Sequence, residues 1–180
     1  RKEAVREQAL DRIRRLAVAA NRLGCNAIAI RVAAKDDDDA FELAATEIKS
    51  VMPAVERFEL NLLIAPCDGL TLSPDRLTDL IKRIGGFRIG SLPDFAHAAK
   101  SGDVVQALRK LAPYAGAVHA TIQGFDAKGA HKDYDLAECV EAIRSVGFVN
   151  TLAIDFVGSG DSVENLDKAR EILQAAIDEE

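Results

Sequence analysis

Residues that can bind a cation stand at the ends of successive apolar runs of this sequence. Asp94 follows the third such run, His119 lies in the fourth and Asp155 in the fifth. Carboxylates suit hard divalent cations such as Mg²⁺ and Mn²⁺, and imidazole suits Zn²⁺ and related ions. A cation held by such groups polarises a substrate carbonyl and eases removal of a proton from the neighbouring carbon, which a carboxylate can accept. If they meet in space, the three residues predict a metal site for proton transfer.

Other polar residues stand at the same kind of position. Arg31 belongs to the first apolar run, Cys67 and Asp68 follow the second, and His97 comes three residues after Asp94. A lone aspartate or histidine at such a place more often supports a loop through hydrogen bonds than binds a ligand. A cysteine there is more often a packed thiol than a nucleophile.

Asp155 has a structural alternative of its own. It lies within the apolar run TLAIDFV, where a charged carboxylate is costly unless it is paired or bound to a metal. We therefore expect a polar partner close to it. The alternative to a metal site is a structural pair between Asp155 and His119 or Arg31.

The elements that must position these residues alternate regularly. Apolar residues spaced three and four apart predict helices, and short β-branched runs predict buried strands. The predicted helices cover residues 1–23, 40–57, 74–84, 104–111, 136–146 and 163–176. The predicted strands cover residues 27–33, 60–65, 87–92, 117–122 and 151–157.

This alternation indicates an α/β fold with a parallel sheet built from βαβ units. The carboxyl ends of parallel strands lie along one edge of the sheet, where ligands bind, and the candidate residues all belong to such ends. No glycine-rich phosphate-binding loop follows any predicted strand. A nucleotide-binding fold is therefore disfavoured.

Two polar clusters in loops have ordinary explanations. The run from Asp36 to Asp39 is interpreted as the cap and solvated first turn of the next helix, rather than as a cation site. His131, Lys132 and Asp133 are interpreted as an exposed polar cluster with a helix cap.

Composition and charge exclude several classes of protein. The chain has 180 residues, 48% of them hydrophobic, as expected for a single globular domain over residues 1–180. The net charge of −6 argues against nucleic acid or an anionic membrane as a partner. No run is long enough to span a membrane. Three widely spaced cysteines favour a reduced, cytoplasmic protein.

Four motifs, taken in order, resemble those of a known family. LLIAPCDGL, SLPDF, AVHATI and LAIDFVGSGD are similar in order and spacing to the sugar-phosphate isomerase/epimerase family, whose fold is the xylose isomerase-like (β/α)8 TIM barrel. The resemblance runs from about Arg12 to Ala176 and corresponds to the family's fourth to eighth strands. It implies that about five of the eight β/α units are present and that the N-terminal strands are missing from this sequence.

The resemblance also implies a metal site. In the family a divalent ion, commonly Mn, Mg, Co or Zn, is held by a Glu, an Asp, a His and a second Glu. The Asp falls on Asp94, the His on His119 and the second Glu on the shorter Asp155, whereas the first Glu falls on Ala65. The two family glutamates also shuttle the proton, so Asp155 remains as the one catalytic carboxylate.

The implied substrate is a small sugar or sugar phosphate, and the implied reaction is isomerisation or epimerisation. Four residues are substrate-binding candidates: His97, Arg31, Cys67 and Asp68. His97 matches a position that contacts substrate in some epimerases of the family, and Cys67 or Asp68 is also a partial substitute for the lost Glu. Because two positions depart from the family pattern, two alternatives stay open. One is an inactive barrel that acts as a binding or scaffold module, and the other is a metal-dependent dehydratase or lyase.

Five strands cannot close an eight-stranded barrel. An open sheet has unpaired edges, which proteins normally cover. We therefore expect either a homo-oligomer or pairing with a missing N-terminal segment.

Overall fold

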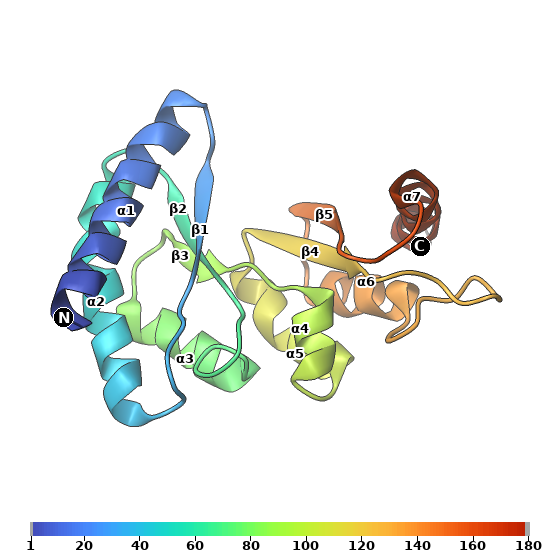
Figure 1. Ribbon diagram of the computed structural model, residues 1–180, viewed down its shortest axis with the longest axis horizontal. Helices are drawn as coiled ribbons and strands as arrows, with labels where there is room; N and C mark the ends of the chain where they lie inside the picture. Colours follow the sequence, from blue (N-terminus) through green and yellow to red (C-terminus); the bar gives the residue numbers. More distant parts are fainter. Residues whose placement is uncertain (1, 179–180) are drawn as a thin grey trace. The chain divides into compact units, whose positions relative to one another are not determined.

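The computed structural model describes residues 2–178, which fall into two compact units. The first unit ends at Ser91 and the second begins at Leu92, and each is described by itself (Figure 1). In both units helices alternate with parallel strands, as the sequence predicts. That the chain forms a single domain stays a prediction. Among the described residues no helix combines the length and apolar character needed to cross a membrane.

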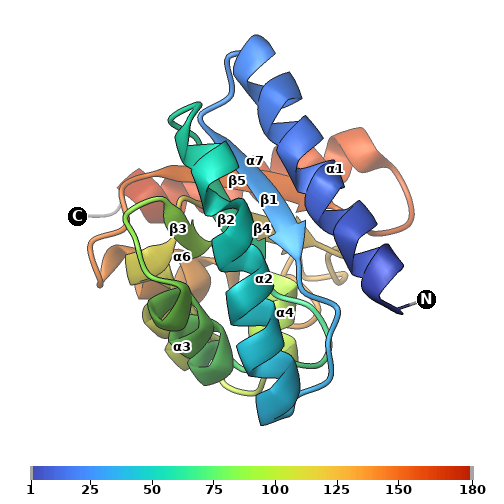
Figure 2. The same ribbon diagram turned by 90° about the vertical axis from the view of Figure 1, so that its left-hand side faces the viewer.

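The first unit contains a three-stranded parallel sheet. Its strands are β1 (Ala27–Arg31), β2 (Asn61–Ala65) and β3 (Ile89–Ser91), in that spatial order. Its helices are α1 (Lys2–Arg22), α2 (Asp38–Glu56) and α3 (Pro74–Ile84). The three helices cover one face of the sheet (Figure 2). Among the described residues β1 pairs with β2 alone, which leaves its outer edge unpaired.

The central strand β2 is the most deeply buried part of this unit. Leu62 and Ile64 are fully buried and Leu63 is 5% exposed. Side chains on both faces of β2 are therefore covered, which is what its uninterrupted apolar run predicts. The three residues fix β2 in the core and bring its carboxyl end, Ala65, to the edge where the following loop begins.

The acidic run before α2 caps the helix, as the sequence predicts. The side chain of Asp37 accepts a hydrogen bond from the Ala40 amide at 2.8 Å. Asp36 and Asp38 each accept a hydrogen bond from the Arg76 guanidinium of α3, at 2.9 and 3.1 Å. These carboxylates thus serve the helix start and link α2 to α3.

The second unit is built on two parallel strands, β4 (Ala117–Ile122) and β5 (Thr151–Phe156). Its helices, in chain order, are α4 (Phe95–Lys100), α5 (Val104–Leu111), the short 3-10 helix η1 (Ala112–Tyr114), α6 (Leu136–Arg144) and α7 (Ser162–Asp178). Its core is formed by the inward faces of these elements, including Phe95, Leu108, Val118, Ile122 and Ile143.

Helix α4 lies where the sequence predicts a loop. The segment FAHAAK spans six residues, too few to display a helical period, and it forms because Asp94 caps its first turn. Because the capping residue, Asp94, is also one of the candidate ligands, the start of α4 helps to position the candidate site.

Two interpretations of polar residues need correction. His131 is partly buried, because its ring packs on Tyr134 with centroids 4.2 Å apart. The cap of α6 is Asp135, which accepts hydrogen bonds from the amides of Ala137 and Glu138. Asp155 is exposed rather than enclosed, but the polar partners expected near it are present, since ligand atoms of Asp94 and His119 lie within 4.8 Å of its carboxylate.

Candidate metal centre

Strand β4 presents two polar side chains on one face. Val118, Ala120 and Ile122 are fully buried on the other face, and successive residues of a strand point to opposite sides. His119 and Thr121 therefore share the remaining face of β4.

Strand β5 adds a carboxylate to that face. In the parallel register Asp155 is the partner of Thr121, and Ala153 is the partner of His119. Register partners project to the same side of a sheet. Asp155 thus lies diagonally across from His119, one pair further toward the carboxyl ends of the strands.

Asp94 enters the same region from the segment before α4. Its Oδ1 atom accepts the His97 amide at 3.0 Å, which caps the helix. The amide of His119 donates to the Pro93 carbonyl oxygen at 2.9 Å, and Asp94 forms an isolated parallel bridge with His119. The backbone of Asp94 is therefore attached to β4 directly beside His119.

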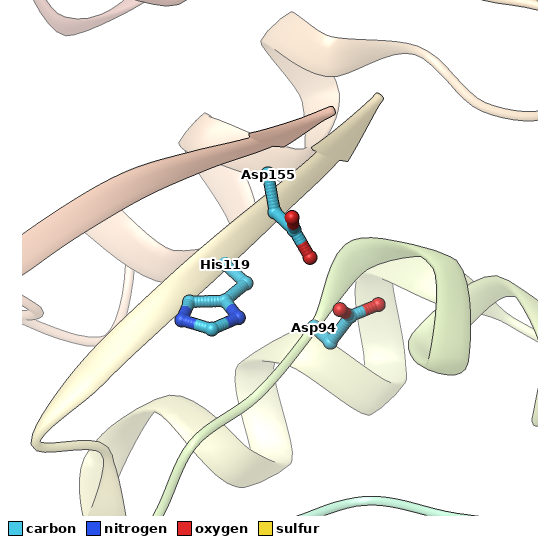
Figure 3. Close-up of side chains that lie close together, drawn as sticks. All are labelled: Asp94, His119 and Asp155. Carbon is cyan, nitrogen blue, oxygen red and sulfur yellow. The ribbon is translucent and has the colours of Figure 1, made fainter. Parts of the chain in front are cut away.

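The three side chains come together (Figure 3). One possible ligand atom from each of Asp94, His119 and Asp155 lies within 4.8 Å of the others. The Asp94 side chain is 14% exposed, His119 is partly buried and Asp155 is exposed, so the cluster opens to solvent at β5. Two carboxylates and one imidazole suit a divalent cation. The geometry thus provides a candidate metal site, and the role of each ligand stays a prediction.

His97 lies beside Asp94. Its Nδ1 atom is 3.3 Å from Asp94 Oδ1, yet this buried nitrogen forms no hydrogen bond with any described residue. The side chain as a whole is 29% exposed. The substrate-binding role of His97 stays a prediction.

The remaining candidates lie in the first unit, where their roles stay predictions. Arg31 is exposed at the end of β1, and its register partner is Ala65 at the end of β2. The Cys67 sulfur lies 3.4 Å from a backbone carbonyl oxygen and 3.4 Å from Thr71 Oγ1, contacts typical of a packed thiol. Asp68 is the next residue of the same loop.

Two residues next to the cluster were missed by the sequence analysis. Thr121 Oγ1 lies 2.5 Å from Asp94 Oδ2, and the Tyr134 hydroxyl donates to the Thr121 carbonyl oxygen. Thr121 could have been identified from the sequence, because it lies two residues after His119 and alternate residues of a strand share one face. No pattern in the sequence signals Tyr134, because its contact depends on how the loop after β4 folds back.

Tyr134 and His131, whose rings lie near the cluster, have pKa values shifted toward the neutral form. Burial raises the pKa of the Tyr134 hydroxyl, and the negative charge of Asp94 raises it further. Burial also lowers the pKa of His131, whose ring packs on Tyr134. Tyr134 therefore acts as a hydrogen-bond donor to Thr121 throughout the neutral pH range.

The chain belongs to a known family. A model of the xylose isomerase-like TIM barrel family matches residues 1–178, which confirms the family and fold expected from the four motifs. The described residues supply five parallel strands of that fold. No curated protein matches the chain.

Solved structures with the same fold include enzymes and metal-bound proteins. An L-ribulose 3-epimerase is 20% identical with a TM-score of 0.76, over 94% of this chain and 61% of its own. A xylose isomerase-like TIM barrel protein from Mycobacterium smegmatis in complex with magnesium is 16% identical with a TM-score of 0.74, over 94% of this chain and 67% of its own. The IolI protein with a bound zinc atom is 10% identical with a TM-score of 0.76, over 98% of this chain and 70% of its own. The chain thus spans 61% of the length of the epimerase, and at these identities the likeness concerns the fold.

Proposed function

We propose that this chain carries the metal site of a sugar or sugar-phosphate isomerase or epimerase, in which a divalent cation assists proton transfer next to a carbonyl group. The observation that carries the proposal is the convergence of Asp94, His119 and Asp155 within 4.8 Å. The epimerase among the similar structures supports a sugar as the substrate class. The structures with magnesium and zinc support a divalent cation.

The three residues differ in what they contribute. Asp94 and His119 are attached to each other through the backbone and supply ligand atoms at a fixed separation. Asp155 is exposed, so its carboxylate can both hold the ion and accept a substrate proton. A bound divalent ion would polarise the substrate carbonyl and lower the barrier to that transfer.

Two departures from the family pattern limit the expected rate. Ala65 stands where the resemblance places the first proton-transferring Glu. Asp155 is one methylene, about 1.5 Å, shorter than the second, and a displacement of about 1 Å can cost ~100-fold in rate. The apolar side chain of Ala65 also favours a second candidate function, a barrel that binds a small molecule without turning it over.

Metal binding is the first test. We expect the wild-type chain to bind one Mn²⁺, measured by the loss of the free-ion signal in electron paramagnetic resonance. Asp94→Asn and Asp155→Asn should each weaken binding at least about tenfold, because even changes around a ligand cost ~10–100-fold. Asp167→Asn is the matched control, since its carboxylate is 62% exposed and pairs with Arg170 on α7. Wild-type protein that takes up no Mn²⁺, or equal binding by all variants, would contradict the proposal.

Proton exchange then separates the two candidate functions. With Mn²⁺ in D2O, a panel of ketoses and ketose phosphates should incorporate deuterium next to the carbonyl, detected by proton nuclear magnetic resonance. Asp155→Asn should abolish the exchange, and Asp167→Asn should leave it unchanged. Metal-loaded protein that binds a sugar without exchange would favour the binding module.

We also propose that the chain acts as one domain within a larger assembly in the cytoplasm. The three cysteines are free thiols, which suits a reducing compartment. The outer edge of β1 is unpaired among the described residues, and a second copy or a further segment of chain would cover it.

A further inference from the structure

We infer that Thr121 is a positioning residue for the metal site, holding the Asp94 carboxylate in the orientation in which it can share a cation with His119 and Asp155. The inference rests on the proposed metal-binding function. It assigns a role to a residue that supplies no ligand atom to the cluster.

The contact between Thr121 and Asp94 is short and enclosed. Thr121 is 4% exposed, and its Oγ1 atom lies 2.5 Å from Asp94 Oδ2. An ionised carboxylate can only accept, so the threonine hydroxyl donates. The other carboxylate oxygen, Oδ1, accepts the His97 amide at 3.0 Å. With a donor on each oxygen the carboxylate cannot rotate freely, while each oxygen keeps a lone pair for a cation.

The position of Thr121 in β4 makes this contact useful. Thr121 is two residues beyond His119 on the same face, and it is the register partner of Asp155. The segment of Asp94 is therefore joined to β4 twice, through the His119 amide to Pro93 and through the Thr121 side chain. Asp94 thus keeps its place relative to the strand that carries His119.

Tyr134 in turn holds Thr121. Its hydroxyl donates to the Thr121 carbonyl oxygen, and its ring packs edge-on against Phe95 with centroids 6.2 Å apart. Phe95 is fully buried and follows Asp94 directly. A chain of contacts therefore connects Thr121 to Asp94 through Tyr134 and Phe95. These contacts hold the Thr121 hydroxyl and the Asp94 carboxylate at a fixed separation.

Packing alone does not require a hydroxyl at this position. A buried strand position favours a β-branched side chain, and valine has the same shape as threonine. The Thr121 hydroxyl donates its hydrogen bond to Asp94 Oδ2. Orientation of that carboxylate is therefore what threonine supplies and valine lacks.

The test compares Thr121→Val with Thr121→Ser. Outer partners of metal ligands typically change affinity by ~10–100-fold, so the valine variant should bind Mn²⁺ about that much more weakly. The serine variant keeps the hydroxyl and should bind within a few-fold of wild type. The visible absorption spectrum of the Co²⁺-loaded protein should change in the valine variant and stay like wild type in the serine variant. A purely structural role would lower the melting temperature without altering that spectrum.

The outcomes separate this inference from the proposed function. Wild-type protein that binds no Mn²⁺ would overturn both. Wild-type binding matched by Thr121→Val, with an unchanged Co²⁺ spectrum, would overturn only the role of Thr121. If Thr121→Val does not fold, Thr121→Ala is compared with Thr121→Ser, and equal Mn²⁺ affinities of that pair would equally overturn it.

Discussion

Among single residues, His131 is held as a neutral imidazole in the loop after β4. Its Nε2 atom accepts the Gln123 amide at 3.2 Å. The ring also packs edge-on against Phe125, with centroids 6.1 Å apart, and on Tyr134. An imidazolium has no lone pair for the amide. Burial, the largest effect, lowers the pKa of His131, so protonation works against this arrangement of the loop.

We predict that this histidine makes folding stability depend on pH. Because the pKa of His131 is lower in the folded than in the unfolded chain, its contribution is complete above the ordinary histidine pKa of about 6.5 and is lost as the pH falls below it. The free energy of unfolding, measured in urea between pH 8 and pH 5.5, should fall more for wild type than for His131→Asn. The other two histidines are common to both proteins and cancel in the difference. Parallel curves for the two proteins would contradict the prediction.

The three candidate ligands could be picked out from the sequence at this scale by residue type, whereas the residues that contact them could not. Asp94, His119 and Asp155 stand out because charged or imidazole groups are unusual beside apolar runs. Thr121 does not stand out, since threonine is common in strands whatever its side chain binds. Tyr134 contacts Thr121 across a loop, and neither composition nor spacing encodes such a contact.

Among the elements, the ends of β4 and β5 pack without space between them. The Val157 amide donates to the Ile122 carbonyl oxygen at 3.0 Å. A Cβ atom at Gly158 would overlap the Gln123 carbonyl oxygen and lie 2.7 Å from its carbon. The backbone at Gly158 is not in the left-handed region, so glycine is required there for space alone.

We predict that Gly158→Ala disturbs the metal site. Inserting a methyl group against backbone should destabilise the fold by about 1–3 kcal/mol. It should also weaken Mn²⁺ binding, because separating the ends of β4 and β5 shifts Asp155 relative to His119. Chemical denaturation and Mn²⁺ titration measure the two effects.

Gly147→Ala is the matched control for Gly158→Ala. Gly147 has a φ of +82° and nothing within 4 Å of an added Cβ, so alanine there adds about 1–2 kcal/mol of backbone strain without a clash. It should lower stability while leaving Mn²⁺ affinity unchanged. Equal Mn²⁺ affinities of both variants and wild type would contradict the role of the strand ends.

For an element with clear capping residues at both ends, the sequence predicted both end residues correctly. Helix α3 begins at Pro74 after the capping Ser73 and ends before Gly85, all of them local signals. Helix α4 was missed because six residues carry no period. Strand β3 is shorter than its predicted range, since pairing with β2 covers only Ile89 to Ser91, and pairing depends on the neighbour rather than on the strand itself.

At the scale of the whole chain, the outer edge of β1, which has no strand partner among the described residues, borders an apolar groove. The groove has a volume of about 590 Å³ and lies between α1, β1 and α2, with Leu10, Ile13, Ile30 and Leu43 among its lining residues. An unpaired strand edge beside an apolar surface favours association.

The repeating helix–strand pattern and the four motifs predicted the family, but no pattern in them identifies what covers this edge.

We predict that the chain self-associates through this region. Light scattering after gel filtration should give a mass above the monomer value of 19.4 kDa that rises with concentration. Ile30→Lys places a charge in the groove and should shift the mass toward the monomer. Val5→Lys adds the same charge at a site 62% exposed on α1 and should not. A constant monomer mass for wild type would contradict the prediction.

Asp94 caps helix α4 and also belongs to the candidate metal cluster, and these two roles differ in the side chains that can fill them. Asparagine and serine begin a helix about as well as aspartate. In a variant that does not bind a metal ion, asparagine or serine could replace Asp94 without loss of the helix. The proposed metal site therefore predicts that position 94 stays aspartate in natural variants of this chain, whereas capping alone would also allow asparagine or serine.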